Sequence, residues 1–156
     1  MCFISPTKGR LSLEEVYQDM MAFIESVPNA QFKIIIGTDS QAKNYTCFVT
    51  AIIVHQVGKG ARYYYKKKKL RKIESLRQKI FFETALSLDT ASKITEILVE
   101  DGRDHLDLEI HLDIGPNGDT KDLIKEIVGM VVGSGFDAKI KPDSCGASKV
   151  ADKYTK

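Results

Sequence analysis

Apolar residues recur along the chain with two different periods, and the changes of period predict its secondary structure. Ser12 and Glu15 form a capping-box pattern, and the apolar residues that follow predict a helix over residues 12–27. Three runs rich in β-branched and aromatic residues come next, separated by short turns, and they predict an antiparallel meander. Its strands are expected at residues 32–39, 46–57 and 63–67.

The second half of the chain alternates between helical and strand-like spacing. Helices are expected at residues 70–92, 119–132 and from about 143 onward, and strands at residues 106–114 and 136–141. A meander followed by strand–helix crossovers indicates an α/β fold, with a mixed five-stranded sheet and helices on both of its faces. In such a sheet, functional side chains usually lie beyond the carboxyl ends of neighbouring parallel strands.

Length and composition are typical of one globular domain, which is expected to span residues 1–156. The chain has 156 residues, of which 43% are hydrophobic and 28% charged. No apolar run approaches the ~18 residues of a membrane helix, and the first ten residues lack a signal-peptide pattern, so we expect a cytoplasmic protein without membrane contact. Cys2, Cys47 and Cys145 are too scattered for a disulfide framework or a zinc site.

The charges are unevenly distributed, although the formal net charge is only +2. Residues 58–79 contain ten Lys or Arg and one acid, whereas residues 80–122 contain eleven acids and three Lys or Arg. The basic block predicts binding to nucleic acid, whether RNA, DNA or hybrid, and a solvated lysine edge is the alternative interpretation. The residues expected to contact phosphates are Lys66, Lys67, Lys68, Lys69, Arg71 and Lys72. Tyrosines at 63–65 could stack on bases, but alternation along a strand favours a core role.

Three acids occupy positions that suggest a functional role. Asp39 ends the first strand of the meander and Asp113 ends the fourth strand, so both carboxylates project from one edge if these strands are parallel neighbours. An Asx-turn is the alternative role for Asp39. Glu83 lies on the apolar stripe of the helix expected at 70–92, where a carboxylate needs a cation partner, either a metal ion or a Lys or Arg.

The last expected helix contributes two further acids. Asp143 follows Pro142 where a helix N-cap belongs, so capping is one interpretation and metal ligation the other. Asp152 lies further into the helix, where capping does not explain it and solvation beside Lys149 or Lys153 is the alternative. Convergent carboxylates supply the hard oxygen ligands that Mg²⁺ or Mn²⁺ prefers, and two such ions can hydrolyse a phosphodiester bond.

Five stretches of the sequence resemble the ribonuclease H-like superfamily, and within it the YkuK-type family of uncharacterised proteins. They are FKIIIGTDSQ at 32–41, the hairpin at 49–64, FFETALS at 81–87, IHLDIGPNGDT at 110–120 and the segment from 141 to the C-terminus. The resemblance implies a ribonuclease H-like core over residues 32–156, with the helix at 12–27 as an addition to the minimal fold.

The resemblance also implies a divalent-metal-dependent nuclease, with a catalytically silent nucleic-acid-binding module as the alternative. Its implied catalytic and metal-binding acids are Asp39, Glu83, Asp113 and Asp152, with Asp143 as a rival to Asp152 for the fourth position. Ribonuclease H enzymes often carry a helper His before the last helix, but no His follows His111 in this chain. Activation of water would therefore fall to the metal ions alone.

Overall fold

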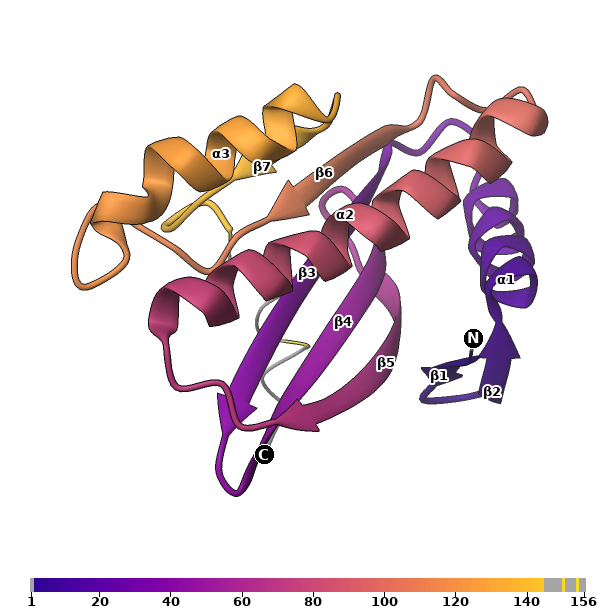
Figure 1. The fold of residues 1–156 in the computed structure, drawn as a ribbon. Coiled ribbons are helices and arrows are strands. Elements are labelled where there is room, and N and C mark those ends of the chain that lie inside the picture. The colour runs from indigo at the N-terminus through magenta and orange to yellow at the C-terminus, as the bar shows by residue number, and fades with distance from the viewer. Residues whose placement is uncertain (1, 145–149, 151–153, 155–156) are drawn as a thin grey trace.

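A computed structural model describes residues 2–144, 150 and 154, and it contains one mixed sheet of seven strands. The strands are β1 (Cys2–Ser5), β2 (Gly9–Ser12), β3 (Phe32–Ala42), β4 (Tyr45–Gln56), β5 (Ala61–Arg71), β6 (Asp107–His111) and β7 (Asp137–Lys139). They are arranged in the order β2-β1-β5-β4-β3-β6-β7 (Figure 1). The helices are α1 (Leu13–Ser26), α2 (Leu76–Glu100) and α3 (Ile124–Gly133), with a short 3₁₀ turn, Lys121–Leu123, before α3.

The sheet contains the expected α/β arrangement together with two strands that the sequence pattern did not predict. β3, β4 and β5 form the antiparallel meander, and β6 and β7 continue the sheet in parallel beyond β3. The prediction of five strands was incomplete, because β1 and β2 form a hairpin that joins β5 through the pair Ile4 and Tyr65. Strands of four residues are too short to display a period of two, which explains why the pattern missed them.

The helix boundaries show where long-range pairing overrides local preference. α1 begins as expected, because Ser12 and Glu15 complete the capping box. The helix expected from residue 70 begins at Leu76 instead, behind the N-cap Ser75, and it continues to Glu100. Residues 70 and 71 belong to β5, where Arg71 pairs with Tyr45 of β4. Their good helix propensity yields to pairing with a long neighbouring strand.

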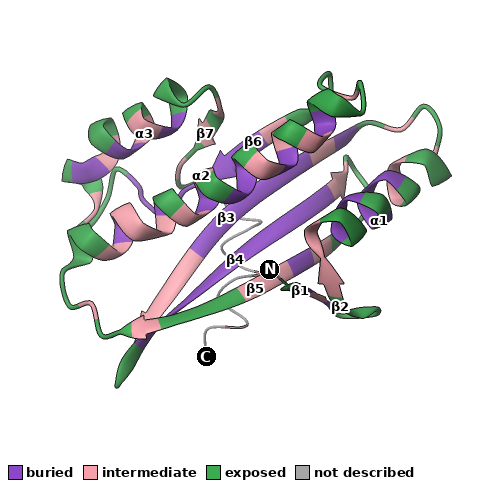
Figure 2. Ribbon diagram, turned by 45° about the vertical axis from the view of Figure 1, so that its right-hand side comes forward, coloured by how far each residue is buried: buried purple, intermediate pink, exposed green. Residues whose placement is uncertain are grey.

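The described helices α1–α3 pack on one face of the sheet. α1, α2 and α3 share the main apolar core with the inward side chains of β3, β4 and β6, among them Ile36 and Ile110 (Figures 1 and 2). On the opposite face Val150 packs on Ile35 and Ile53, and it is helical, as is Tyr154. The remainder of the expected final helix lies outside the described residues. None of the described helices combines the length and apolar character that crossing a membrane requires.

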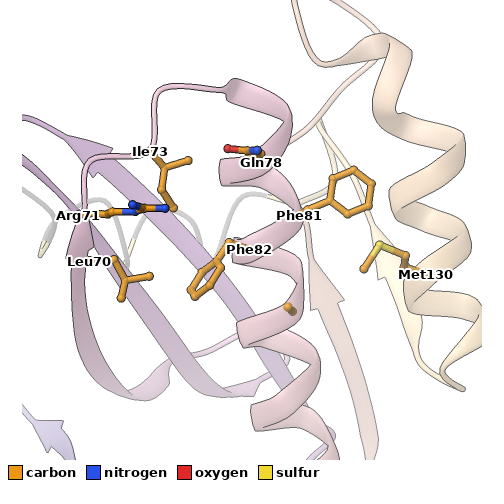
Figure 3. Close-up of a pocket in the computed structure, with 8 residues that line it drawn as sticks. Leu70, Arg71, Ile73, Gln78, Phe81, Phe82 and Met130 are labelled. Atoms are coloured by element: carbon orange, nitrogen blue, oxygen red, sulfur yellow. The ribbon is translucent and has the colours of Figure 1, made fainter.

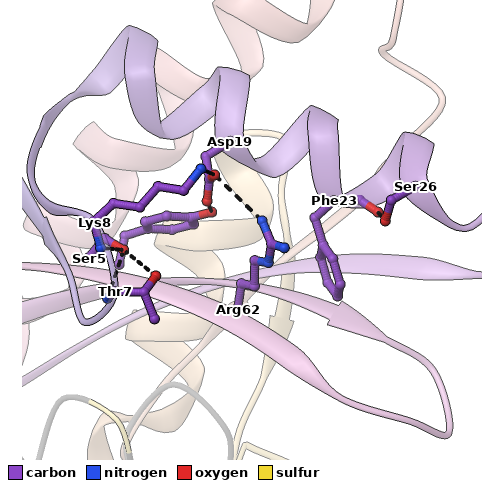
Figure 4. Close-up of polar contacts among 8 residues, drawn as sticks. Ser5, Thr7, Lys8, Asp19, Phe23, Ser26 and Arg62 are labelled. Carbon is purple, nitrogen blue, oxygen red and sulfur yellow. Dashed lines mark hydrogen bonds and ion pairs between the residues drawn. The ribbon is translucent and has the colours of Figure 1, made fainter.

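A buried acid fixes the N-terminal hairpin and α1 to the meander. Asp19 of α1 accepts hydrogen bonds from Tyr64 of β5 and from Lys8, whose Nζ lies 2.5 Å away, and Arg62 lies 3.5 Å from the same carboxylate (Figure 4). Burial works to raise the pKa of Asp19, but these hydrogen bonds and the two positive charges outweigh it, and the pKa is lowered. Ionised Asp19 therefore stabilises the fold above its unfolded pKa, and this contribution is lost as the pH falls.

Replacing Asp19 with Ala is expected to destabilise the protein by about 1–3 kcal/mol, because the buried Tyr64 hydroxyl loses its acceptor. Lys8 and Arg62 are each about half exposed, so their charges return to water at little cost. Urea unfolding at pH 7 measures the change. Asp19→Asn keeps an acceptor and should cost less, and equal stability of parent and Ala variant would contradict the role given to Asp19.

Candidate active site

Asp39 and Asp113 lie at the same edge of the sheet, as the strand pattern predicts. β3 and β6 are parallel neighbours, and Gly37 of β3 is paired with His111 of β6. Asp39 lies two residues after Gly37 but within β3 rather than at its end as expected, because pairing with β4 extends that strand to Ala42. Asp113 lies two residues beyond the end of β6, so both acids are near the edge where functional side chains usually lie. Both aspartates are half-buried.

Glu83 lies on α2, which packs across β3, and its carboxylate reaches the end of that strand. Its Oε2 accepts a hydrogen bond from the Ser40 hydroxyl at 2.5 Å. Burial raises the pKa of Glu83, the Ser40 hydrogen bond opposes this, and the charges of Asp39 and Asp113 raise it further, to about 8. Three carboxylates therefore influence one another here, and we call Asp39, Glu83 and Asp113 the acid cluster.

The alternative interpretation of Glu83, a structural ion pair, is not seen in the described part of the chain. Lys79 is the one cation that lowers the pKa of Glu83 there, and it forms no ion pair with it. Without such a pair, Glu83, with its pKa of about 8, keeps its proton near neutral pH. The uncharged carboxyl limits the charge repulsion within the acid cluster. A bound cation would favour the ionised form instead.

Asp113 of the acid cluster has a basic partner. Lys141 Nζ lies 2.9 Å from Asp113 Oδ1. Gly115 permits this approach, since a Cβ atom at that position would lie only 2.9 Å from the Lys141 Cβ. The backbone bond from Lys141 N–H to the Ile114 carbonyl, also 2.9 Å, holds the two segments together. A metal ion at Asp113 would have to compete with this lysine.

The chemistry of the acid cluster fits a hard divalent cation, although its side chains do not surround a common point. Carboxylate oxygens are the ligands of Mg²⁺ and Mn²⁺, and burial together with the neighbouring carboxylates raises the pKa of Glu83, as in a site where a cation would favour the ionised form. Within residues 2–144, 150 and 154, no three His, Cys, Asp or Glu side chains are placed to hold one ion. Asp152 lies outside the described residues. Asp143 is exposed on a turn, and it is not among the charges that shift Glu83.

A buried His–Glu pair lies on β6, and sequence reasoning assigned it no role. His111 Nε2 is 2.8 Å from Glu109 Oε1, and Lys33 Nζ is 3.6 Å from the other oxygen of Glu109. His111 Nδ1 has no hydrogen-bond partner among the described residues. The alternation of Glu109 and His111 within β6 is the signal that places both on one face of the sheet.

The basic block forms an edge of the sheet rather than the start of a helix. Lys66 to Lys69 belong to β5, which pairs with β4 along its length and with β1 only at Tyr65, so its outer edge beyond Tyr65 has no partner strand among the described residues. Figure 2 shows this half of β5 as largely exposed. Because side chains alternate along a strand, these lysines lie on opposite faces of the sheet. Lys67 and Lys69 line a hollow with Tyr154, whereas Lys68 approaches Phe82 of α2 on the other face.

The tyrosines of β5 serve packing, as alternation favoured. Tyr64 is 1% exposed and belongs to the main core. Tyr65 stacks on Tyr154 with 3.8 Å between ring centroids, and the Tyr63 and Tyr154 hydroxyls are 2.7 Å apart. Stacking of bases on these rings would require displacement of Tyr154.

Comparison with known proteins confirms the resemblance drawn from the sequence. The family model described as Ribonuclease H-like matches residues 15–156. The Bacillus subtilis (strain 168) protein named "Uncharacterized protein YkuK" is 40% identical over 167 residues, which cover 99% of this chain and 96% of that protein. No solved structure gives a significant match. The chain belongs to the ribonuclease H-like family.

Proposed function

We propose that the protein is a divalent-metal-dependent nuclease that hydrolyses phosphodiester bonds in nucleic acid, the whole chain acting as one domain. The observation that carries this proposal is the position of Glu83, hydrogen-bonded to Ser40 and close enough to Asp39 and Asp113 that, after burial, their charges also raise its pKa. Acids that repel one another near one edge of a sheet are typical of a site that binds cations. Membership of the ribonuclease H-like family supports this class of chemistry.

In this proposal Asp39, Glu83 and Asp113 would hold Mg²⁺ or Mn²⁺, with Asp152 in preference to Asp143 as the fourth ligand. Such ions, when bound, activate water and stabilise the leaving oxygen of a phosphodiester. The Ser40 hydroxyl orients Glu83 by its hydrogen bond. Lys141 would release Asp113 and could then pair with a substrate phosphate.

The direct test is a cleavage assay on labelled RNA, DNA and hybrid duplexes in the presence of Mg²⁺ or Mn²⁺. We expect shorter products from at least one substrate, and none when EDTA replaces the metal ion. Binding without cleavage of any substrate, under all these conditions, would overturn the nuclease proposal.

A catalytically silent nucleic-acid-binding module is the second candidate. The ion pair between Lys141 and Asp113 favours it, because a cation from the protein already occupies part of the acid cluster. In this case the metal ions should change neither the melting temperature of the protein nor the length of any substrate. Binding through β5 would remain.

Nucleic acid is expected to bind through the exposed lysines of β5, and we predict the effect of removing two of them. Changing Lys67 and Lys69 together to Ala should weaken binding to every nucleic acid tested and lower the salt slope by about 0.9 per lost phosphate contact on duplex DNA. Fluorescence anisotropy at several salt concentrations, without metal, measures this slope.

A matched control removes the same charge elsewhere. Lys121 and Lys125 are exposed near the start of α3, and their change to Ala should leave the salt slope unchanged. If the Lys67 and Lys69 variant also keeps the parent slope, these lysines act only to protect an open sheet edge from pairing with other chains.

A further inference from the structure

An open apolar groove lies between the end of β5, the first turns of α2 and the helix α3. Its volume is about 630 Å³, within the range of roughly 300–1,000 Å³ typical of small-molecule sites. Figure 3 shows Phe81 directed toward Met130 of α3, and Phe82 on the side nearer β5. Arg71 and Gln78 contribute the polar atoms of the lining.

The groove and the acid cluster share one helical turn. Phe81 and Phe82 immediately precede Glu83 on α2, but they line the groove whereas Glu83 lies on the helix face of Ile80 and Thr84, so a strand seated on these rings would reach the carboxylates by passing around α2. Phe82 is held in place by Phe48 of β4, with 4.7 Å between ring centroids. The lining is therefore a fixed surface on secondary structure.

Cations approach both aromatic rings of the groove. The Arg77 guanidinium lies 4.8 Å from the Phe81 ring and Lys68 Nζ lies 6.0 Å from the Phe82 ring. Arg71 is exposed on the rim and forms no ion pair among the described residues. Aromatic rings combined with cations are the pattern by which proteins stack unpaired bases and contact their phosphates.

We propose that this groove binds an unpaired nucleobase, so that the preferred substrate carries a single-stranded segment next to the phosphodiester bond at the acid cluster. The proposal rests on the proposed function and names its substrate class. The base stacks on Phe81 or Phe82, the Gln78 amide contacts its polar edge, and Arg71 contacts the adjoining phosphate. An acidic peptide could pair with the cations, but its carboxylates would not stack on the two aromatic rings as a base does.

The test fills the groove without removing any core side chain. Ala85 is exposed and lines the groove, so Ala85→Trp places an indole where the base would stack. Affinity is measured by fluorescence anisotropy in EDTA, with labelled oligothymidylate and a DNA duplex, each of about 20 nucleotides per strand. We expect Ala85→Trp to weaken single-strand binding by about fivefold or more, the lower limit for one stacked base, and to leave duplex binding within about twofold.

Val99→Trp is the control, because Val99 is exposed at the far end of the same helix. It should bind both nucleic acids like the parent, and thermal melting should show that both variants are folded. Equal single-strand affinity in Ala85→Trp and the parent would overturn the inference and assign the groove to a protein partner. Equal losses on single strand and duplex would also overturn it, since the groove would then contact only backbone.

Failure of this inference differs from failure of the proposed function. The binding assay contains no metal, so it is independent of hydrolysis. If Ala85→Trp binds single strands like the parent, metal-dependent cleavage by the parent would still support the proposed function. Absence of cleavage, with the groove effect retained, would instead support a silent module that binds single strands.

Discussion

Changing Asp39 to Asn is expected to lower metal-dependent hydrolysis by about 100-fold or more. The substitution removes one anionic ligand with little change of side-chain shape. Even changes to residues that only support metal ligands typically lower metal affinity or activity 10- to 100-fold. Mg²⁺ or Mn²⁺ should also raise the melting temperature of the parent and not that of the variant, because only the folded parent gains from binding. Cleavage rates and melting curves with metal or EDTA measure both effects.

Asp107→Asn provides the control for this experiment. Asp107 is exposed at the start of β6, on the strand that leads to Asp113, and it lies at the opposite end of that strand from the acid cluster. It should retain both the parent rate and the metal-induced shift in melting temperature. Equal metal-induced shifts in the parent and in Asp39→Asn would remove Asp39 from the site.

The acid cluster could be predicted from the sequence because each acid is fixed by a local rule. Asp39 and Asp113 each follow a strongly apolar run of residues, and neighbouring parallel strands bring such positions together. Glu83 was placed correctly although α2 begins six residues later than expected, at Leu76 rather than at 70. Ile80 and Thr84 are buried on α2 wherever the helix begins. The helix face on which Glu83 lies therefore does not depend on the predicted boundary.

Features that depend on distant partners could not be predicted in this way. The sequence pattern ended the third strand at residue 67 and began a helix at 70, whereas pairing with β4 extends β5 to Arg71. The hairpin of β1 and β2 depends on contacts with β5, and Asp19 depends on Tyr64, which is 45 residues away. The groove combines residues of β5, α2 and α3, three elements that no single period connects. The choice between Asp143 and Asp152 stays a prediction, because Asp152 lies outside the described residues.

Replacing Glu83 with Gln is expected to stabilise the metal-free protein at pH 8 by a few kcal/mol. The folded pKa of Glu83, about 8, lies above its ordinary value of 4.5, so the folded state holds a proton that the unfolded state has released. The free energy of unfolding of the parent should therefore fall as the pH rises from about 4.5 to 8, at about 1.4 kcal/mol per unit of pKa difference. Gln cannot ionise, and its amide oxygen still accepts the Ser40 hydrogen bond.

Urea unfolding at pH 5, 7 and 8, with EDTA or with Mn²⁺, separates the electrostatic effect from the metal effect. In EDTA the advantage of Glu83→Gln should grow with pH, whereas Mn²⁺ should stabilise only the parent, and most strongly at pH 8 where Glu83 ionises most readily. Glu96→Gln changes an exposed acid of the same helix and should follow the parent in every condition. Parallel pH profiles for the parent and Glu83→Gln would mean that neither burial nor the charges of Asp39 and Asp113 raise the pKa of Glu83, and the acid cluster would then lose its main support.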